Sequence, residues 1–122
     1  HLNAGSIFVL DFWYGPAVLS IRPSFRTKVV EKDGLKIIRT VEPKLDIPAQ
    51  TCVSDYWLMV IRDDRVVDEV REAHAMRFFF PQEMAGYLSW SEFELVKMCE
   101  FLNPASPPSE STWNAMAVAK AI

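Results

Sequence analysis

The sequence predicts an α+β fold in which an antiparallel β meander is inserted into the second half of an α/β sheet. Residues 6–14 form an almost continuous apolar run, which is typical of a strand buried on both faces of a parallel sheet. Residues 27–80 contain β-branched and aromatic segments separated by turn residues, a pattern typical of antiparallel strands. A chain of 122 residues is long enough to bury one hydrophobic core, so we expect one domain at most.

Composition limits the classes of partner. The net charge is −3 with acidic and basic residues interspersed, so the chain lacks the basic surface that binds nucleic acid or an anionic membrane. Its longest apolar runs, residues 6–14 and 56–61, are far shorter than the ~20 residues of a membrane-spanning helix. Cys52 and Cys99 fit no metal-ligand spacing and are predicted to be buried free thiols. We therefore expect a cytoplasmic protein with no nucleic-acid partner, no membrane partner and no metal.

The first predicted strand ends at Gly15 and Pro16. Residues 17–26 contain Pro23 and show no clear period, so they are interpreted as a connector with room for one helical turn.

Four antiparallel strands are predicted in the meander, over residues 28–31, 35–45, 51–61 and 65–79. Asp33-Gly34 predicts a type I′ hairpin, because that turn needs a positive φ at both central residues. Residues 62–65 are expected to form a longer turn. Pro43 and Pro48 lack the N–H that a central ladder uses, so we place them at a sheet edge or in a loop.

The last third of the chain predicts a short helix followed by two strands. Pro81 in the first turn and Glu83 near the positive end of the helix dipole favour a helix start. Residues 93–102 alternate between apolar and charged side chains and predict a strand. Residues 113–119 also predict a strand, although their alanines would suit a helix.

Several segments resemble class I S-adenosylmethionine-dependent methyltransferases. Residues 2–14 have the pattern leucine, two variable residues, glycine, a small residue, an apolar run and Asp11, which is similar to the element that forms the family's fifth strand. Residues 72–84 are similar to the segment that leads into the family's last helix, and residues 93–96 to the strand after it. The resemblance covers essentially the whole chain. It is greatest to the branch with an antiparallel insertion, which includes small-molecule and amino-sugar N-methyltransferases.

The resemblance implies that the chain is the C-terminal fragment of a Rossmann-like methyltransferase sheet with an inserted antiparallel β meander. Residues 1–26 would hold the last parallel-type strand and its connector, residues 27–80 the inserted module, and residues 81–122 the closing helix and two antiparallel strands. One position departs from the family, because Glu92 stands where a Gly-Phe turn is usual. Either Glu92 adopts a positive φ, or the loop differs from its usual shape.

The S-adenosylmethionine site is expected to be missing. Folds of this kind bind their cofactor at the carboxyl ends of the first strands, with a glycine-rich turn and an acid that binds ribose hydroxyls. The four glycines of this chain are scattered and form no such cluster. The chain also begins with His1 instead of Met, which we interpret as a fragment or a processed product. We expect no cofactor in this fragment, S-adenosylmethionine in the parent enzyme, and no methyl transfer by the chain alone.

Trp13 and Tyr14 are the first candidates for the wall of a substrate pocket, because open α/β sheets bind ligands at the carboxyl ends of their strands. Both could instead pack beneath the inserted sheet, as large aromatic residues usually do. Asp11 lies among apolar residues and would need a hydrogen-bonding partner if buried. A structural role is therefore favoured for Asp11 over catalysis.

His74 and Arg77 are the other pocket candidates. Their odd spacing places them on opposite faces of a strand, so they cannot form a same-face pair. His74 could act as a base for an amine or hydroxyl acceptor. Arg77 could bind an anionic substrate group or pair with a carboxylate such as Glu83. No complete set of catalytic residues is evident.

Two functions remain open at this point. The first is the substrate-side part of a methyltransferase that acts on a small-molecule acceptor. The second is a non-enzymatic β-rich binding or dimerisation module, for which Trp57 and its aromatic neighbours provide an apolar surface. We also expect a homo-oligomer, because the strand at residues 6–14 would expose an unpaired edge and apolar surface. Covering ~600 Å² of that surface would contribute on the order of 15 kcal/mol before the cost of association is subtracted.

Overall fold

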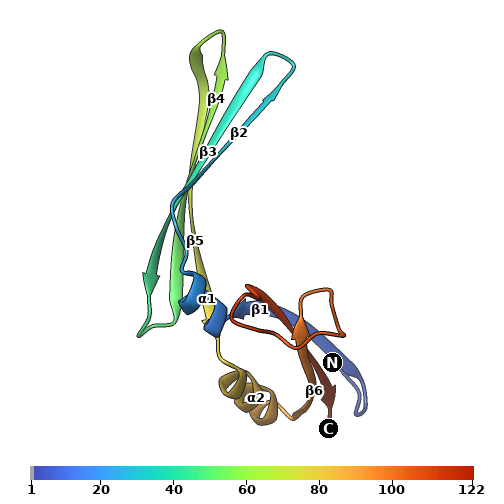
Figure 1. Ribbon diagram of the computed structural model, residues 1–122. Coiled ribbons are helices and arrows are strands. Elements are labelled where there is room, and N and C mark those ends of the chain that lie inside the picture. Colours follow the sequence, from blue (N-terminus) through green and yellow to red (C-terminus); the bar gives the residue numbers. More distant parts are fainter. Residues whose placement is uncertain (1) are drawn as a thin grey trace. The chain divides into compact units, whose positions relative to one another are not determined.

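The computed structural model describes residues 2–122, and His1 lies outside the described residues. The chain forms two compact units (Figure 1). Unit 1 comprises His1–Arg22 and Phe78–Ile122, and unit 2 comprises Pro23–Arg77. The long strand β5, Arg65–Phe79, begins in unit 2 and ends in unit 1.

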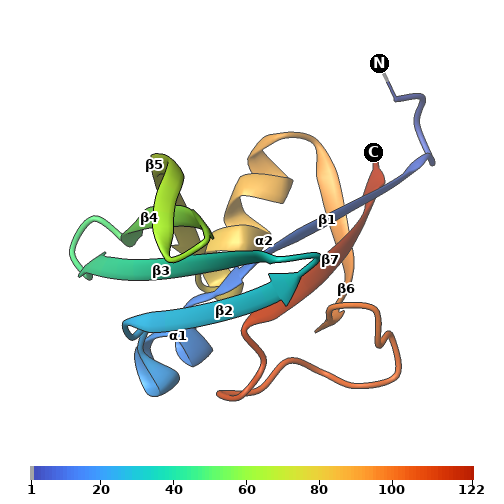
Figure 2. The same cartoon turned by 90° about the horizontal axis from the view of Figure 1, so that it is seen from above.

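Unit 1 is a sheet segment with a helix on one face (Figure 2). Its own strands are β1 (Ile7–Tyr14), β6 (Phe93–Glu100) and β7 (Asn114–Ala121). β1 pairs antiparallel with β7 from Ile7 to Trp13, and parallel with β5 only at Trp13 and Tyr14. β7 pairs antiparallel with β6. The strand order is therefore β5-β1-β7-β6.

The core of unit 1 lies between this sheet and the helix α2 (Pro81–Trp90). Met84 and Leu88 of α2 are buried in one cluster with side chains of β1 and β7. The β7 members of that cluster are fully buried alanines: Ala115, Ala117 and Ala119. Because a methyl group is small, a row of alanines lets the helix approach the sheet closely. The same alanines that would suit a helix in the sequence are thus explained by packing within a strand.

A second helix, α1 (Gly15–Ile21), begins directly at the end of β1. The sequence predicted a connector with one helical turn, and the structure contains a helix of seven residues. Pro16 lies in its first turn, where the missing N–H removes no hydrogen bond. Ala17 and Val18 are fully buried, so tertiary packing stabilises a segment whose sequence shows no helical period.

Unit 2 is an antiparallel sheet with the strand order β2-β3-β4-β5. The new strands are β2 (Arg26–Lys32), β3 (Leu35–Asp46) and β4 (Thr51–Arg62). The four strands predicted from the sequence are confirmed. The ends of β3, β4 and β5 agree within one residue because turn signals bound them, whereas β2 begins two residues earlier than predicted and ends one residue later.

Two tight turns have positive φ at both central residues. Asp33 and Gly34 have φ values of 53° and 76°, as the predicted type I′ hairpin requires. The expected longer turn at residues 62–65 is wrong, because the outer two residues pair directly. Asp63 and Asp64 alone form that turn, with φ values of 48° and 57°. Aspartate tolerates this conformation because its short side chain can form local hydrogen bonds.

The positions of the prolines and of Glu92 follow from backbone constraints. Pro43 lies in β3 beyond the last pair with β2, where β3 is an edge strand, and Pro48 lies in the turn after it. Both placements agree with the prediction. Glu92 has a φ of 62°, which is the first of the two alternatives left open by the sequence. The carbonyl oxygen of Glu92 accepts a hydrogen bond from the Ile122 N–H at 2.9 Å, which ties this turn to the end of β7.

The described residues were also predicted to contain buried free cysteines and to lack membrane-spanning and metal-binding features. Cys52 and Cys99 are free and fully buried, as predicted, and burial raises the pKa of the Cys52 thiol. Neither helix within residues 2–122 combines the length and apolar character needed to cross a membrane. In the same residues, no group of three or more His, Cys, Asp or Glu side chains is arranged to hold a metal ion.

We predict that Ala117→Leu destabilises the chain by about 1–3 kcal/mol, because the larger side chain would push α2 away from β7. Urea unfolding followed by tryptophan fluorescence measures the change. Val118→Leu is the matched control, since Val118 is only partly buried and lies on the opposite face of β7. Equal stability of the two variants would contradict close packing of α2 on the alanine row.

Candidate functional site

The carboxyl end of β1 carries two of the predicted pocket residues, Trp13 and Tyr14. The Trp13 ring lies 5.2 Å from the Trp113 ring in an edge-to-face arrangement. The Tyr14 N–H donates a hydrogen bond to the Trp113 carbonyl oxygen at 2.9 Å. The loop that leads into β7 is therefore attached to the end of β1. Trp113 was not singled out in the sequence, because only the β1–β7 pairing brings it to this end of the strand.

Trp13 and Tyr14 point to opposite faces of the sheet, since they are consecutive strand residues. Tyr14 is buried in the core cluster beneath α2. Trp13 is only partly buried and is the one of the two that retains exposed surface. Asp11 lies on the same face as Trp13 and is exposed. Water can therefore solvate its carboxylate, and Asp11 needs no buried hydrogen-bonding partner.

Gly15 allows three chain segments to converge at this end of β1. A Cβ atom at residue 15 would lie 3.0 Å from the Phe80 ring and 3.1 Å from the Phe79 carbonyl oxygen. Contacts of that length are tighter than most Cβ contacts, so a neighbour would have to shift by a few tenths of an ångström. Glycine therefore lets α1 begin beside the end of β5 without such a shift.

His74 and Arg77 both lie in β5, on opposite faces as predicted. The His74 Nε2 atom lies 2.9 Å from a Glu72 carboxylate oxygen, and the His74 ring packs edge-on against Tyr56 at 5.2 Å. When neutral His74 donates its Nε2 proton to Glu72, the lone pair remains on Nδ1 and can accept a proton. Arg77 donates a hydrogen bond to the Gln50 side-chain oxygen at 3.4 Å. The structure does not bring His74 and Arg77 together.

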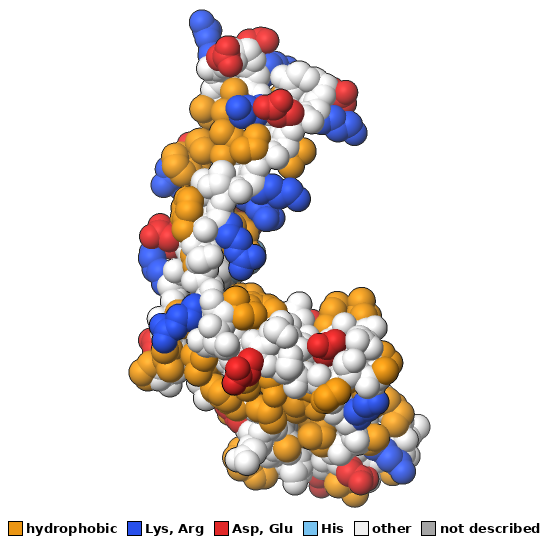
Figure 3. Space-filling view, viewed as in Figure 1, with side chains coloured by type: hydrophobic (Ala, Val, Ile, Leu, Met, Phe, Trp, Pro, Cys, Tyr) orange, Lys and Arg blue, Asp and Glu red, His pale blue; other side chains and the backbone are white. Residues whose placement is uncertain are grey.

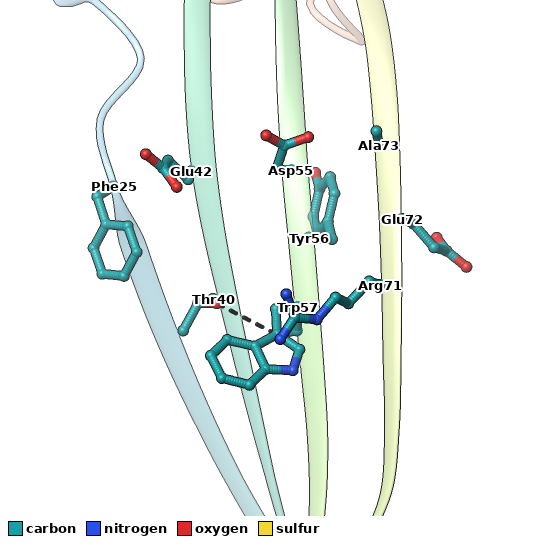
Figure 4. Close-up of a pocket in the computed structure, with 9 residues that line it drawn as sticks. All are labelled: Phe25, Thr40, Glu42, Asp55, Tyr56, Trp57, Arg71, Glu72 and Ala73. Atoms are coloured by element: carbon teal, nitrogen blue, oxygen red, sulfur yellow. Dashed lines mark hydrogen bonds between the residues drawn. The ribbon is translucent and has the colours of Figure 1, made fainter.

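Unit 2 also contains an open hollow of about 590 Å³ on one face of its sheet. Figure 4 shows the side chains around it, which come from β3, β4, β5 and the segment before β2. Trp57 was considered in the sequence as an aromatic surface residue, but Glu42 and Asp55 were missed. They meet because the β3–β4 register places residue 42 opposite residue 55. Residues 42 and 55 are equally distant from residues 48 and 49, so a hairpin centred there would have predicted this pair from the sequence.

The comparisons with known proteins concern the fold. No protein-family profile and no curated protein sequence matches the chain, whereas solved structures do. One is an S-adenosylmethionine-dependent methyltransferase from Clostridium acetobutylicum, with 15% identity and a TM-score of 0.76. Another is the CcbJ methyltransferase from Streptomyces caelestis, with 19% identity and a TM-score of 0.71. A third is an amino pentose methyltransferase from Micromonospora echinaspora, with 15% identity and a TM-score of 0.70.

The chain has the fold of part of an S-adenosylmethionine-dependent methyltransferase. The matches cover 99%, 99% and 100% of this chain but only 46%, 48% and 46% of the three methyltransferases. The chain thus spans less than half the length of these structures. The α+β fold class predicted from the sequence, a fragment of a methyltransferase sheet with an inserted meander, is confirmed.

We predict that Gly15→Ala destabilises the chain by about 1–3 kcal/mol, because the added methyl group would displace the Phe79 backbone. Gly86→Ala is the control. Residue 86 lies inside α2 with no atom within 4 Å of an added Cβ, so that change should stabilise the chain by about 0.5–1 kcal/mol. Thermal unfolding by circular dichroism measures both variants. A stabilising Gly15→Ala would show that the convergence at β1 leaves room for a side chain.

Proposed function

We propose that this chain is the C-terminal, substrate-side part of an S-adenosylmethionine-dependent methyltransferase that acts on a small molecule. In this proposal the half that binds S-adenosylmethionine is not part of the 122 residues, and the chain alone transfers no methyl group. The observation that carries the proposal is the unequal coverage of the structural matches, which is nearly complete for this chain and below half for each methyltransferase.

The positions of the four glycines support this proposal. Gly5 and Gly34 have φ values of 83° and 76° and lie in turns next to strands. Gly15 lies against Phe80 at the start of α1, and Gly86 lies inside α2. Every glycine therefore belongs to a separate local structure. A glycine-rich turn of the kind that cradles a nucleotide-type cofactor needs several of them together.

A small-molecule acceptor is supported by the structural matches. One matched protein is described as an amino pentose methyltransferase, and another as a sugar N-methyltransferase from Streptoalloteichus. Transfer of a methyl group from a sulfonium to an amine or hydroxyl requires in-line positioning and exclusion of water more than strong acid–base catalysis. A chain with few ionisable groups in its core is compatible with that requirement.

The predicted pocket residues remain proposals within this function. Trp13 would form part of the acceptor pocket wall, with Tyr14 fixing the strand end from the core. His74, held by Glu72, would accept a proton from the acceptor through Nδ1. Arg77 would bind an anionic group of the acceptor. The buried free thiols favour a reducing compartment, so we keep the cytoplasm as the proposed location.

The alternative function is a non-enzymatic β-rich binding or dimerisation module. It is favoured by the edge of β1. Within residues 2–122, residues 7–12 of β1 pair with β7 alone, which leaves the other edge without a strand partner. Ile7 and Val9 lie on the face opposite α2 and are 56% and 52% exposed. Figure 3 shows apolar side chains over much of the visible surface of unit 1.

We predict that the isolated chain does not bind S-adenosylmethionine, because the glycine-rich turn and the ribose-binding acid are absent. Isothermal titration calorimetry should show no binding heat, and a radiolabelled methyl-transfer assay should show no product. The matched comparison is a longer product of the same gene that includes the preceding residues, where we expect a strand followed by a Gly-x-Gly turn. Micromolar binding by the 122-residue chain, or a gene with no such upstream strand and turn, would refute the proposal.

We predict that the chain self-associates through β1 and that Val9→Lys shifts it toward a monomer. A lysine on an exposed edge strand opposes pairing with another edge. Multi-angle light scattering at high micromolar concentration measures the mass. Val67→Lys is the control, because Val67 is 56% exposed but lies in unit 2. A monomeric parent chain would contradict the prediction, and a monomer caused only by Val67→Lys would place the contact in unit 2 instead.

A further inference from the structure

The hollow in unit 2 is bounded by groups of two different chemical kinds. Glu42 of β3 and Asp55 of β4 provide carboxylates, while Trp57 and Phe25 provide aromatic rings. Figure 4 shows Phe25 to one side of the hollow and Trp57 at one end, with the carboxylates of Glu42 and Asp55 toward the opposite end. All lining residues belong to unit 2.

Glu42 and Asp55 form a like-charged cross-strand pair. They are directly opposite each other in the β3–β4 register, an arrangement that destabilises a sheet unless the charges are compensated. The Lys44 Nζ atom lies 2.7 Å from Asp55 Oδ2, and this hydrogen bond raises the pKa of Lys44. Asp55 is therefore compensated. The Glu42 charge also contributes to the raised pKa of Lys44. Among residues 2–122, however, the hydrogen bond and ion pair of Lys44 go to Asp55, so the Glu42 carboxylate has no direct cationic partner.

The two aromatic residues give the hollow a carbon surface. The Trp57 Nε1–H donates to Glu69 Oε2 at 3.3 Å, and the Arg71 guanidinium lies over the Trp57 ring at 4.5 Å. The indole is thus fixed in place by two neighbours of β5. Phe25 is 63% exposed, which is a large apolar exposure for a phenylalanine directly beside a hollow. An aromatic surface and a carboxylate without a direct cationic partner together favour an organic cation.

We propose that this hollow binds a small organic cation, a protonated amine carried on a compact carbon ring. The ammonium group would lie at Glu42, and the carbon ring would lie against Phe25 and Trp57. An anionic ligand is disfavoured because Lys44 and Arg71 are already engaged by Asp55 and Trp57. A bare metal ion is disfavoured because it would need more ligands than one carboxylate pair supplies. This inference goes beyond the proposed function, since it concerns a hollow within unit 2 and requires no methyl transfer.

Cyclohexylamine, which is positively charged at neutral pH, is a suitable probe, and cyclohexanol is its neutral counterpart of similar shape. The complete chain is titrated with each compound, and the indole N–H signals of the tryptophans are followed by NMR. The Trp57 signal is assigned from its loss in Trp57→Phe. We expect cyclohexylamine to shift the Trp57 signal saturably, and cyclohexanol to bind more weakly. Absence of a saturable shift, or equal affinity for the two compounds, would overturn the proposal.

Glu42→Gln tests the position of the ammonium group. Removal of one exposed ion pair should weaken cyclohexylamine binding by about two- to fivefold and leave cyclohexanol binding unchanged. Asp68→Asn is the control, because it removes the same charge from the opposite face of β5 and should leave both affinities unchanged. Glu42→Gln should also fold normally, since it relieves a like-charge pair. Equal effects of the two substitutions would refute a specific role of Glu42.

Both titrations are performed without S-adenosylmethionine. If cyclohexylamine does not bind, only the proposed amine site is refuted, and the proposed methyltransferase function still stands. If the chain binds S-adenosylmethionine, only the proposed function is refuted.

Discussion

The pairing of β1 with β7 is the interaction on which unit 1 depends. β1 contacts β5 only at its last two residues, so β7 supplies nearly all of its backbone hydrogen-bonding partners. The same pairing aligns Phe12 with Ala115 and so forms the small-residue surface on which α2 packs. It also brings Trp113 to the carboxyl end of β1, where Trp13 lies. One face of the sheet is thereby covered, while Ile7 and Val9 on the other face remain exposed.

Unit 2 depends on a different constraint, the geometry of its turns. A two-residue turn leaves no freedom in the pairing of the strands that it joins, because a shift by one residue would move every side chain to the other face. The turns at residues 33–34 and 63–64 are both of this kind. β3 and β4 are joined by a longer turn at residues 47–50, and their register places Glu42 opposite Asp55 and Thr40 opposite Trp57. The polar part of the hollow is therefore a consequence of hairpin pairing, and Phe25 joins it from the segment before β2.

In the proposed function, the two units would divide the work of methyl transfer. A methyl group moves between two bound small molecules, so the protein contributes mainly position and a dry environment. Unit 1 has aromatic residues at the end of β1, where Trp13 packs against Trp113. Unit 2 presents polar and aromatic side chains on both of its faces, including the His74–Glu72 pair on one face and the Glu42–Asp55 pair on the other. Such surfaces can recognise a ligand without carrying the cofactor.

The sequence by itself determined the strands of the meander, the Asp33-Gly34 hairpin, the start of α2 and the opposite faces of His74 and Arg77. Each of these follows from local backbone preferences or from the period of two in a strand. The sequence also predicted the strand at the alanine-rich end of the chain. Only the tertiary structure decided that residues 15–21 form a helix and that Glu92 has a positive φ. It also decided that Glu42 lies directly opposite Asp55. The physical reason is that these features depend on what packs or pairs with a segment, and those partners lie far away in the chain.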